Sequence, residues 1–468
     1  MNDARDRLFI GTLVFSLVMT LVFSAALAWD IANNHGGNGA TVLKTTTTTD
    51  ATPSGAAGSS TTGTAGSNTQ GTTGGGSGSA SKTAIPPGAD ITVGAVITQS
   101  GPLDASDAFR ADEAYVQMVN SQGGINGHHL RLDVRDDQGN PSVGRPNFEA
   151  IVQEDHALAI VGECAPLTDS TIVDEINQLQ VPVVNDCLNS AANAYSSPYI
   201  WYTVEGPTSW QGISANYLWK NQNQLKMHKP YVLCVNTSVT IPYCDGFVHQ
   251  WGANGGTTCS GGKCGGDNYD QEQVATTRIQ YESVAQNIKR SGADSIVALL
   301  EPTNEAAFLQ ALSDQGMCPS NGWTQYAPLG TDPSSISAGG NCATGVLADV
   351  GNSYFPSEGT PAEQQLKSAL QRYSPNTPVD NYSLSIGWTP MVIFGEALRR
   401  AGANVSRQSL INQLNSLGGY DTNGLCRPIT WTASNHLAPS FTRWATIAGP
   451  TSYNVTTGWI DANGNPAG

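Results

Sequence analysis

The feature that most constrains the fold is a strand-helix-strand segment near the start of the folded region. An apolar strand over 91–97 is followed by apolar residues at helical spacing between 108 and 119. Gly123-Gly124 ends that helix, because glycine tolerates the left-handed conformation that a helix C-terminus needs. A second apolar strand at 130–134 leads into Asp136-Asp137. The order predicts two parallel strands joined by a crossover helix.

The turn at 120–127 reads Asn-Ser-Gln-Gly-Gly-Ile-Asn-Gly, and a Leu-x-Leu strand with the Asp-Asp end follows it. This combination resembles the type I periplasmic binding fold, in the branch that contains the Leu/Ile/Val-binding proteins of ABC transporters. The resemblance covers nearly all of residues 89–468. It implies an α/β protein of two doubly wound, Rossmann-like lobes joined by a three-strand hinge.

Alternating strands and helices along the rest of the chain also predict doubly wound sheets. We expect strands at 157–161, 181–184, 231–235, 295–300, 326–329 and 345–350, and helices at 168–179, 210–218, 247–251, 281–290, 304–313, 361–373, 387–401 and 406–417. The resemblance adds three crossings between lobes. These place lobe 1 at about 89–207 and 357–425, and lobe 2 at about 208–356 and 426–468, which together make up the solute-binding domain 89–468.

The N-terminal region predicts export. Residues 8–28 carry no charge and are long enough to span a bilayer, whereas Ala26-Leu27-Ala28 fits a signal-peptidase site. Residues 1–29 are therefore interpreted as a transmembrane anchor or as a signal peptide cleaved after Ala28. Residues 30–88, rich in Thr, Ser and Gly, predict a disordered linker with a reach of about 40 Å. Such a tether favours an extracytoplasmic domain held at the cell membrane, with secretion as the alternative.

All nine cysteines fall in the folded part, and in an exported chain they first suggest disulfides, with one left over. Cys164 and Cys187 each follow one of two neighbouring parallel strands, which predicts a bridge at the shared sheet edge. Cys318 with Cys342 is a second candidate, because both flank a loop around one strand.

The other cysteines are less constrained by the sequence. Cys234 lies in an apolar run and is interpreted as a buried free thiol. Cys259 and Cys264 allow a disulfide or a zinc site, although no His follows at finger spacing. The sequence indicates no disulfide partner for Cys244 or Cys426.

Open parallel sheets bind ligands beyond the carboxyl ends of their strands. Applied to each predicted strand, that rule gives the expected ligand-binding residues Ser100, Ala165, Thr168, Asn189, Tyr243, Glu301 and Asp332. Alternative interpretations are a helix cap for Thr168, a turn for Asp332 and simple packing for Tyr243. In the amino-acid binders that the chain resembles, an acidic residue of lobe 2 pairs with the ligand ammonium, and Asp332 matches that position. Ala165 replaces the Ser or Thr usual in lobe 1, which weakens an amino acid as the ligand.

Several classes of function are disfavoured by the sequence. The net charge of −16 and the absence of a Lys/Arg run argue against nucleic acid as a partner. No nucleophile elbow, His-Glu-x-x-His motif or phosphate-binding loop is present, so we expect neither an enzyme nor a cofactor or metal. His128-His129, on the turn before a strand, is expected to be exposed.

The resemblance implies the substrate-binding component of an ABC transporter. Such a protein captures a small polar solute, for example an amino acid, a branched-chain amino acid or an amide, and delivers it to permease subunits in the membrane. The alternative is a ligand-sensing receptor domain that reports to a membrane partner without transport.

Overall fold

The structure is a computed structural model that describes residues 84–101, 103–187, 193–273, 278–328, 333–356, 358–449 and 452–468. The predicted anchor or signal peptide and nearly all of the linker lie outside the described residues, as do Asn189 and Asp332. Within the described part of the chain, no helix is both long and apolar enough to cross a membrane.

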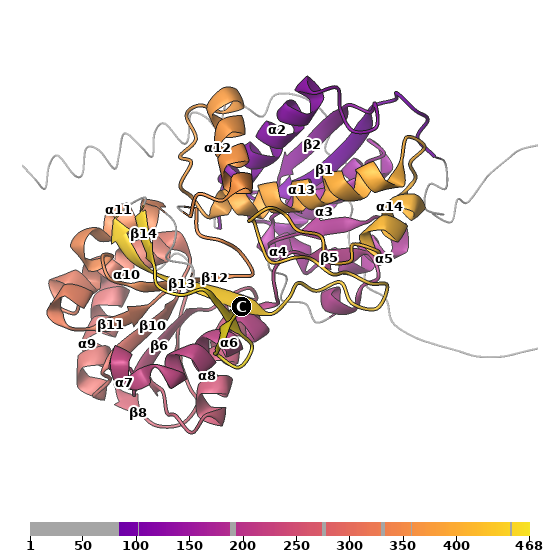
Figure 1. The fold of residues 1–468 in the computed structure, drawn as a ribbon. Coiled ribbons are helices and arrows are strands. Elements are labelled where there is room, and N and C mark those ends of the chain that lie inside the picture. Colours follow the sequence, from indigo (N-terminus) through magenta and orange to yellow (C-terminus); the bar gives the residue numbers. More distant parts are fainter. Residues whose placement is uncertain are drawn as a thin grey trace, which may run out of the picture. The chain divides into compact units, whose positions relative to one another are not determined.

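The first sheet contains five parallel strands in the order β2-β1-β3-β4-β5 (Figure 1). These strands are β1 (Ile91–Ile97), β2 (Leu130–Asp136), β3 (Ala159–Glu163), β4 (Val183–Asn185) and β5 (Ile200–Tyr202). Helix α2 (Ser106–Ser121) connects the first two strands, so the strand-helix-strand prediction is confirmed.

Helices cover both faces of this sheet, and some of them come from much later in the sequence. They are α3 (Pro141–Gln153), α4 (Pro166–Asp169), α5 (Val173–Leu179), α12 (Pro361–Tyr373), α13 (Ser383–Ala401) and α14 (Arg407–Leu414), with a short 3-10 turn η1 (Ala194–Ser196). On one face Val93 and Val161 pack with Trp388 of α13, and on the other Ile160 packs with Phe148 of α3. The strands are therefore buried on both sides, as a doubly wound sheet requires.

The predicted helix 168–179 is interrupted. It forms as α4 and α5, with residues 170–172 between them. Thr168 is bonded to Asp137 through its hydroxyl, and Thr171 donates back to the Thr168 carbonyl, while Ile172 is completely buried. These tertiary contacts outweigh the helical spacing of the apolar residues.

The second sheet contains eleven strands among the described residues. Its parallel centre is β6 (Pro230–Val235), β10 (Ser295–Leu299), β11 (Thr324–Tyr326) and β12 (Leu347–Gly351); β7 (Cys259–Ser260), β8 (Lys263–Cys264) and β9 (Asp270–Glu272) extend it at one side. At the other side β13 (Phe441–Gly449) runs antiparallel to β12 and is followed by β14 (Ser452–Val455), β15 (Trp459–Asp461) and β16 (Pro466–Ala467). No strand was expected in this C-terminal part of the sequence.

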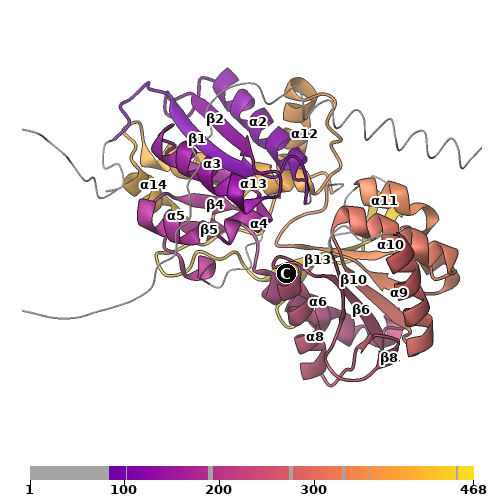
Figure 2. The ribbon, with the colours of Figure 1, turned by 180° about the vertical axis from the view of Figure 1, so that it is seen from behind.

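The helices of the second sheet lie in two groups, which Figure 2 shows from behind. They are α6 (Pro207–Lys220), α7 (Gln222–Leu225), α8 (Ile241–Ala253), α9 (Arg278–Ser291), α10 (Pro302–Asp314) and α11 (Pro333–Gly339), with 3-10 turns η2 (Pro319–Asn321) and η3 (Gly340–Cys342). Phe247 of α8 packs on the face that carries Leu299, whereas Phe308 of α10 packs on the face that carries Ala298.

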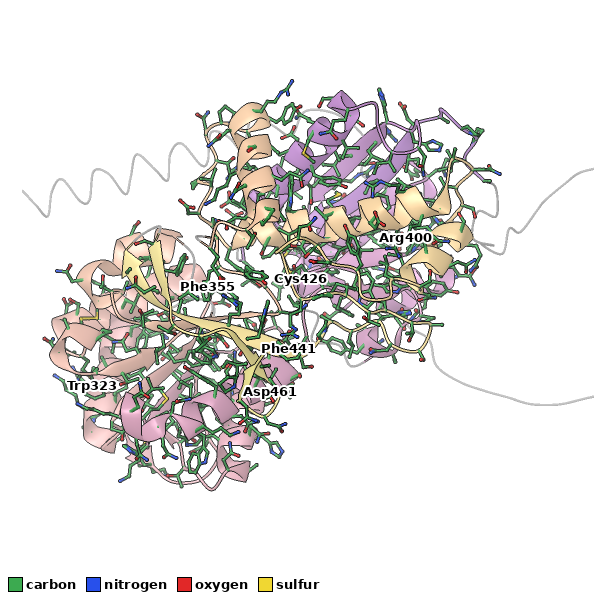
Figure 3. All side chains as sticks on the ribbon, viewed as in Figure 1. Trp323, Phe355, Arg400, Cys426, Phe441 and Asp461 are labelled. Carbon is green, nitrogen blue, oxygen red and sulfur yellow. A yellow bond between two sulfur atoms is a disulfide. The ribbon has the colours of Figure 1, made fainter. Side chains whose placement is uncertain are left out.

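The chain passes between the two sheets three times, between β5 and α6, between β12 and α12, and between α14 and β13. These segments contact one another: Asn352 Nδ2 donates to the Thr203 carbonyl at 2.9 Å, and Tyr354 N donates to the Leu425 carbonyl at 3.1 Å. Figure 3 labels Phe355 and Cys426 in this region. The exact lobe boundaries given above stay a prediction.

Four disulfides join Cys164 to Cys187, Cys234 to Cys244, Cys259 to Cys264, and Cys318 to Cys342; Cys426 is a buried free thiol. The first and last are the two pairs that strand order suggests.

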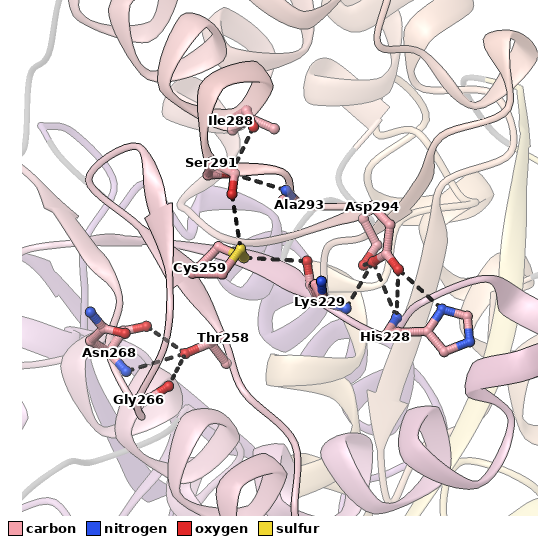
Figure 4. The surroundings of a disulfide bond; sticks show 12 residues. His228, Lys229, Thr258, Cys259, Gly266, Asn268, Ile288, Ser291, Ala293 and Asp294 are labelled. Carbon is pink, nitrogen blue, oxygen red and sulfur yellow. Dashed lines mark hydrogen bonds and ion pairs between the residues drawn. A yellow bond between two sulfur atoms is a disulfide. The ribbon is translucent and has the colours of Figure 1, made fainter.

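The free-thiol prediction for Cys234 is wrong, because the end of β6 and the first turn of α8 bring it to Cys244. Cys259 and Cys264 face each other across the antiparallel pair β7 and β8, which favours the disulfide over zinc (Figure 4).

The prediction that both histidines of the His-His pair are exposed is also partly wrong. His129 is exposed, but His128 is completely buried. Its Nδ1 lies 2.6 Å from the Ala89 carbonyl and its Nε2 lies 3.0 Å from the Ala403 carbonyl. The ring therefore ties the start of β1 to the segment after α13, and this long-range contact has no signal in the local sequence.

Candidate ligand-binding site

Ser100 lies at the carboxyl end of β1, next to the end of β2. Its hydroxyl donates to Asp136 Oδ2 at 2.6 Å, and the backbone N–H groups of Gln99 and Ser100 donate to Asp136 Oδ1 at 2.9 and 3.3 Å. Partial burial acts to raise the pKa of Asp136, but these hydrogen bonds lower it overall. Ser100 remains exposed, so the loop that carries it is held open to solvent at this sheet edge.

Thr168 and Ala165 lie at the same edge, beyond β3, and both are completely buried. Thr168 Oγ1 donates to Asp137 Oδ2 at 2.6 Å, and Thr98 Oγ1 donates to the other oxygen at 2.7 Å. Thr168 therefore does not act as the helix cap considered above. Since its proton is used by Asp137, a ligand contact from this hydroxyl would use its remaining lone pairs.

Two buried carboxyl groups face each other at the end of β3. Glu163 is the last residue of the strand and Asp169 the last residue of α4, and their exposed fractions are 1% and 3%. Burial raises the pKa of Glu163 to about 7, and burial together with the charge of Glu163 raises that of Asp169. Two such groups in contact are stable when they share a proton.

Asp186 follows β4 directly, and Glu205 lies three residues beyond the end of β5. Burial raises the pKa of Asp186 to about 7 against a hydrogen bond from Thr203, and burial raises that of Glu205 well above its ordinary value. Both Glu205 oxygens and Asp186 Oδ1 have no hydrogen-bond partner. We call Asp186 and Glu205 the acidic row, because they follow the neighbouring parallel strands β4 and β5 and because the charge of Asp186 adds to the rise in the pKa of Glu205. Glu163 is not part of it, since the strand register pairs Glu163 with Asn185 and Asn185 with Tyr202, so Glu163 points to the opposite face of the sheet from Asp186.

Residues of the second sheet approach the row at Glu205. A Cβ on Gly351 of β12 would lie 3.2 Å from Glu205 Oε2 and 3.0 Å from the Trp210 ring. Trp210 Nε1 donates to Asp349 at 3.0 Å, and Ser214 Oγ donates to the same oxygen at 2.5 Å. Asp349 therefore accepts hydrogen bonds from two side chains, whereas neither carboxyl oxygen of Glu205 has a partner.

Tyr243, on α8, lies next to Trp210. Its ring is 97% buried and its centroid lies 5.9 Å from that of Trp210. Burial is the main cause that raises its pKa, and the charges of Glu205, Asp349 and Asp186 add to it. Tyr243 therefore lies close to the acids of both sheets.

Glu301 stands at the carboxyl end of β10 and at the N-terminus of α10. Asn304 Nδ2 donates to its Oε2 at 2.9 Å, while Oε1 has no partner. Burial raises the pKa of Glu301, and it raises that of Glu305, one turn further on, to about 8. Two buried carboxyl groups therefore lie at the N-terminus of α10, toward which the free backbone N–H groups of the helix point.

One pocket lies apart from these acids. It is lined by Ser353, Tyr354, Phe355, Pro356, Glu363, Leu366, Val379, Asn381, Ser385, Gly424 and Leu425. Its one acidic residue, Glu363, already pairs with Lys367 at 2.9 Å.

The structure therefore places five predicted residues at the carboxyl edges of the sheets: Ser100, Ala165, Thr168, Tyr243 and Glu301. Their contact with a ligand stays a prediction, as does that of Asn189 and Asp332. The strand-end rule also reaches Glu163 and Asp186, which stand directly at strand ends, but the sequence offers no reason to prefer them to their neighbours. Glu205 lies three residues beyond β5 and was not selected.

Two doubly wound sheets, three connecting segments and polar groups at the carboxyl ends of parallel strands define the type I periplasmic binding fold. Residues 90–448 match the family profile described as periplasmic binding protein. The chain belongs to this family.

Solved structures of the same fold share little sequence with the chain. A leucine-binding protein from Thermotoga maritima is 15% identical, with a TM-score of 0.63, and the alignment covers 79% of this chain and 99% of that one. A branched-chain amino acid ABC transporter protein from Thermus thermophilus with bound valine is 17% identical, with a TM-score of 0.67 and coverage of 81% and 97%. A solute-binding protein from R. palustris in complex with 4-hydroxybenzoate is 18% identical, with a TM-score of 0.65 and coverage of 80% and 97%.

No curated protein matches the sequence significantly. The family and the fold neighbours are binding proteins rather than enzymes.

Proposed function

We propose that this chain is the extracytoplasmic substrate-binding component of an ABC transporter, which captures a small polar solute between its two lobes and delivers it to permease subunits. The observation that carries the proposal is the pair of doubly wound sheets whose carboxyl edges bear buried, unsatisfied polar side chains. Ligands of open α/β sheets bind at such edges.

The structural neighbours support a small organic solute without naming it. One neighbour holds valine and another holds 4-hydroxybenzoate, so this fold accommodates ligands of different charge and shape. The four disulfides support an oxidising, extracytoplasmic compartment, where such bonds persist. Attachment to the membrane through residues 8–28 remains part of the proposal.

Capture works through a population shift. A solute that contacts both lobes binds the closed state more tightly than the open state and so stabilises closure. The three segments between the sheets are where the chain would bend.

The test is isothermal titration calorimetry of the full-length protein with amino acids, amides, urea, small carboxylates and organic cations. We expect saturable binding of at least one compound, together with a more compact scattering profile in its presence. A protein that binds nothing across this panel and keeps one scattering profile would contradict the proposal. Delivery is tested separately by uptake of the identified solute in cells with and without the gene.

A further inference from the structure

The acidic row concentrates negative charge at one edge of the first sheet. Strands β4 and β5 are neighbours in that sheet and run parallel, so their carboxyl ends lie side by side. Neighbouring strands are about 4.8 Å apart, so Asp186 and Glu205 lie within reach of one solute. Their exposed fractions are 5% and 2%.

Among the described residues, no Arg or Lys forms an ion pair with this row, because their ion pairs involve other acids; Arg145 pairs with Glu175, for example, and Arg443 with Glu358. Both Glu205 oxygens and Asp186 Oδ1 lack a hydrogen-bond partner. Burying carboxylates without a counter-charge is costly, and the cost persists until the groups hold protons or meet a cation.

Two carboxyl groups alone do not make a site for a single metal ion. A bound Ca²⁺ or Mg²⁺ needs several oxygens within about 2.0 to 2.6 Å of one point. In the described part of the chain, no group of three or more acidic, His or Cys side chains converges closely enough to hold a metal ion. The positive charge that fits this row is therefore spread over a molecule.

Aromatic side chains adjoin the same acids. Trp210 lies against Gly351 beside Glu205, and Tyr243 packs near Trp210. Ammonium and guanidinium groups are attracted to aromatic faces as well as to carboxylates.

Resting on the function proposed above, we propose that the solute is an organic cation with more than one ammonium or guanidinium group, held by the unpaired carboxylates of Asp186 and Glu205. Its charges replace the protons that the empty row retains. Since burial raises the pKa of Asp186 to about 7 and that of Glu205 well above its ordinary value, binding near neutral pH releases protons.

The experiment is calorimetry of the full-length protein with putrescine, spermidine, L-arginine and L-lysine as cationic probes. L-Valine, 4-hydroxybenzoate, Ca²⁺ and Mg²⁺ are the comparison ligands. We expect saturable binding of a cationic probe, with proton release that is measured by repeating the titration in buffers of different ionisation enthalpy. The variants Asp186→Asn and Glu205→Gln should each weaken this binding by about tenfold or more.

The matched control is Glu154→Gln, an exposed residue beyond α3, which should leave the affinity within about twofold. Thermal unfolding checks that the variants fold. We expect both to be folded, because in each of them an amide replaces an uncompensated buried carboxylate. Binding of valine, 4-hydroxybenzoate or a metal ion in place of the cations overturns the cationic assignment, as does cation binding that both variants leave unchanged. These outcomes leave the proposed solute-binding function standing, whereas failure of every organic ligand, including the wider panel above, overturns both.

Discussion

Glu305 provides a direct test of the cost of buried charge in this protein. Its carboxyl group is 2% exposed, Oε2 has no partner, and burial alone raises its pKa from 4.5 to about 8. Between these two values the folded state keeps a proton that the unfolded state has lost. Stability therefore falls as pH rises through this range, by about 1.4 kcal/mol per pH unit.

Glu305→Gln removes this titration while keeping the size of the side chain. From about pH 5 to about pH 7.5 the wild-type protein should lose roughly 3 kcal/mol through this one group, and the variant should not. We therefore expect the two to be similar in free energy of unfolding at pH 5, and the variant to be more stable by roughly 3 kcal/mol at pH 7.5. Other buried acids titrate equally in both proteins and cancel in the difference.

The assay is urea unfolding followed by tryptophan fluorescence at both pH values. Glu154→Gln, at an exposed position, serves as the control and should show no pH-dependent difference from wild type. A difference between Glu305→Gln and wild type that stays the same at both pH values would refute the reasoning.

Three further changes test the fold in the same unfolding assay. Replacing Cys164 and Cys187 by Ala opens a loop with a sequence separation of 23 and should cost about 3 kcal/mol; an unchanged urea midpoint would argue against the bridge. Gly387→Ala places a methyl group against the α2 backbone and should cost about 1–3 kcal/mol, whereas Gly212→Ala, in open space on α6, should be neutral or stabilising by about 0.5–1 kcal/mol; equal effects would contradict the close packing of α13 on α2. Arg407→Ala frees the buried carbonyl of Ala157 and the half-buried carbonyl of Leu179, at 2.7 and 3.1 Å, and should cost about 3 kcal/mol; a loss below about 1 kcal/mol would show that these bonds contribute little.

The sequence predicted those parts of the fold that depend on local pattern. The spacing of apolar residues located α2 within two residues at each end and β1 exactly as it forms. It did not reveal the strands after residue 440, because β13 to β16 are joined by short polar turns and depend on pairing with β12. Likewise, the break between α4 and α5 follows from the distant Asp137, which periodicity does not report.

The candidate site was predicted only in part, for a related reason. The rule about strand ends placed Ser100, Ala165 and Thr168 correctly at one sheet edge, but it could not rank the neighbouring acids. Acidic residues are ordinarily exposed, so their burial is a property of the packed molecule rather than of the residue type. The end of β3 holds Glu163 against Asp169 of α4, and Glu205 lies against Gly351 of β12, contacts that the residue type does not report.

This burial links stability to binding. In the empty protein the acidic row either holds protons or carries uncompensated charge, and each state limits the free energy of folding near neutral pH. A cationic solute would remove that cost, so part of its binding energy would appear as increased stability of the folded state. Glu305 stands at the start of α10, on the second sheet rather than in the row. Its pH effect should therefore persist when solute is bound, whereas that of Asp186 should diminish.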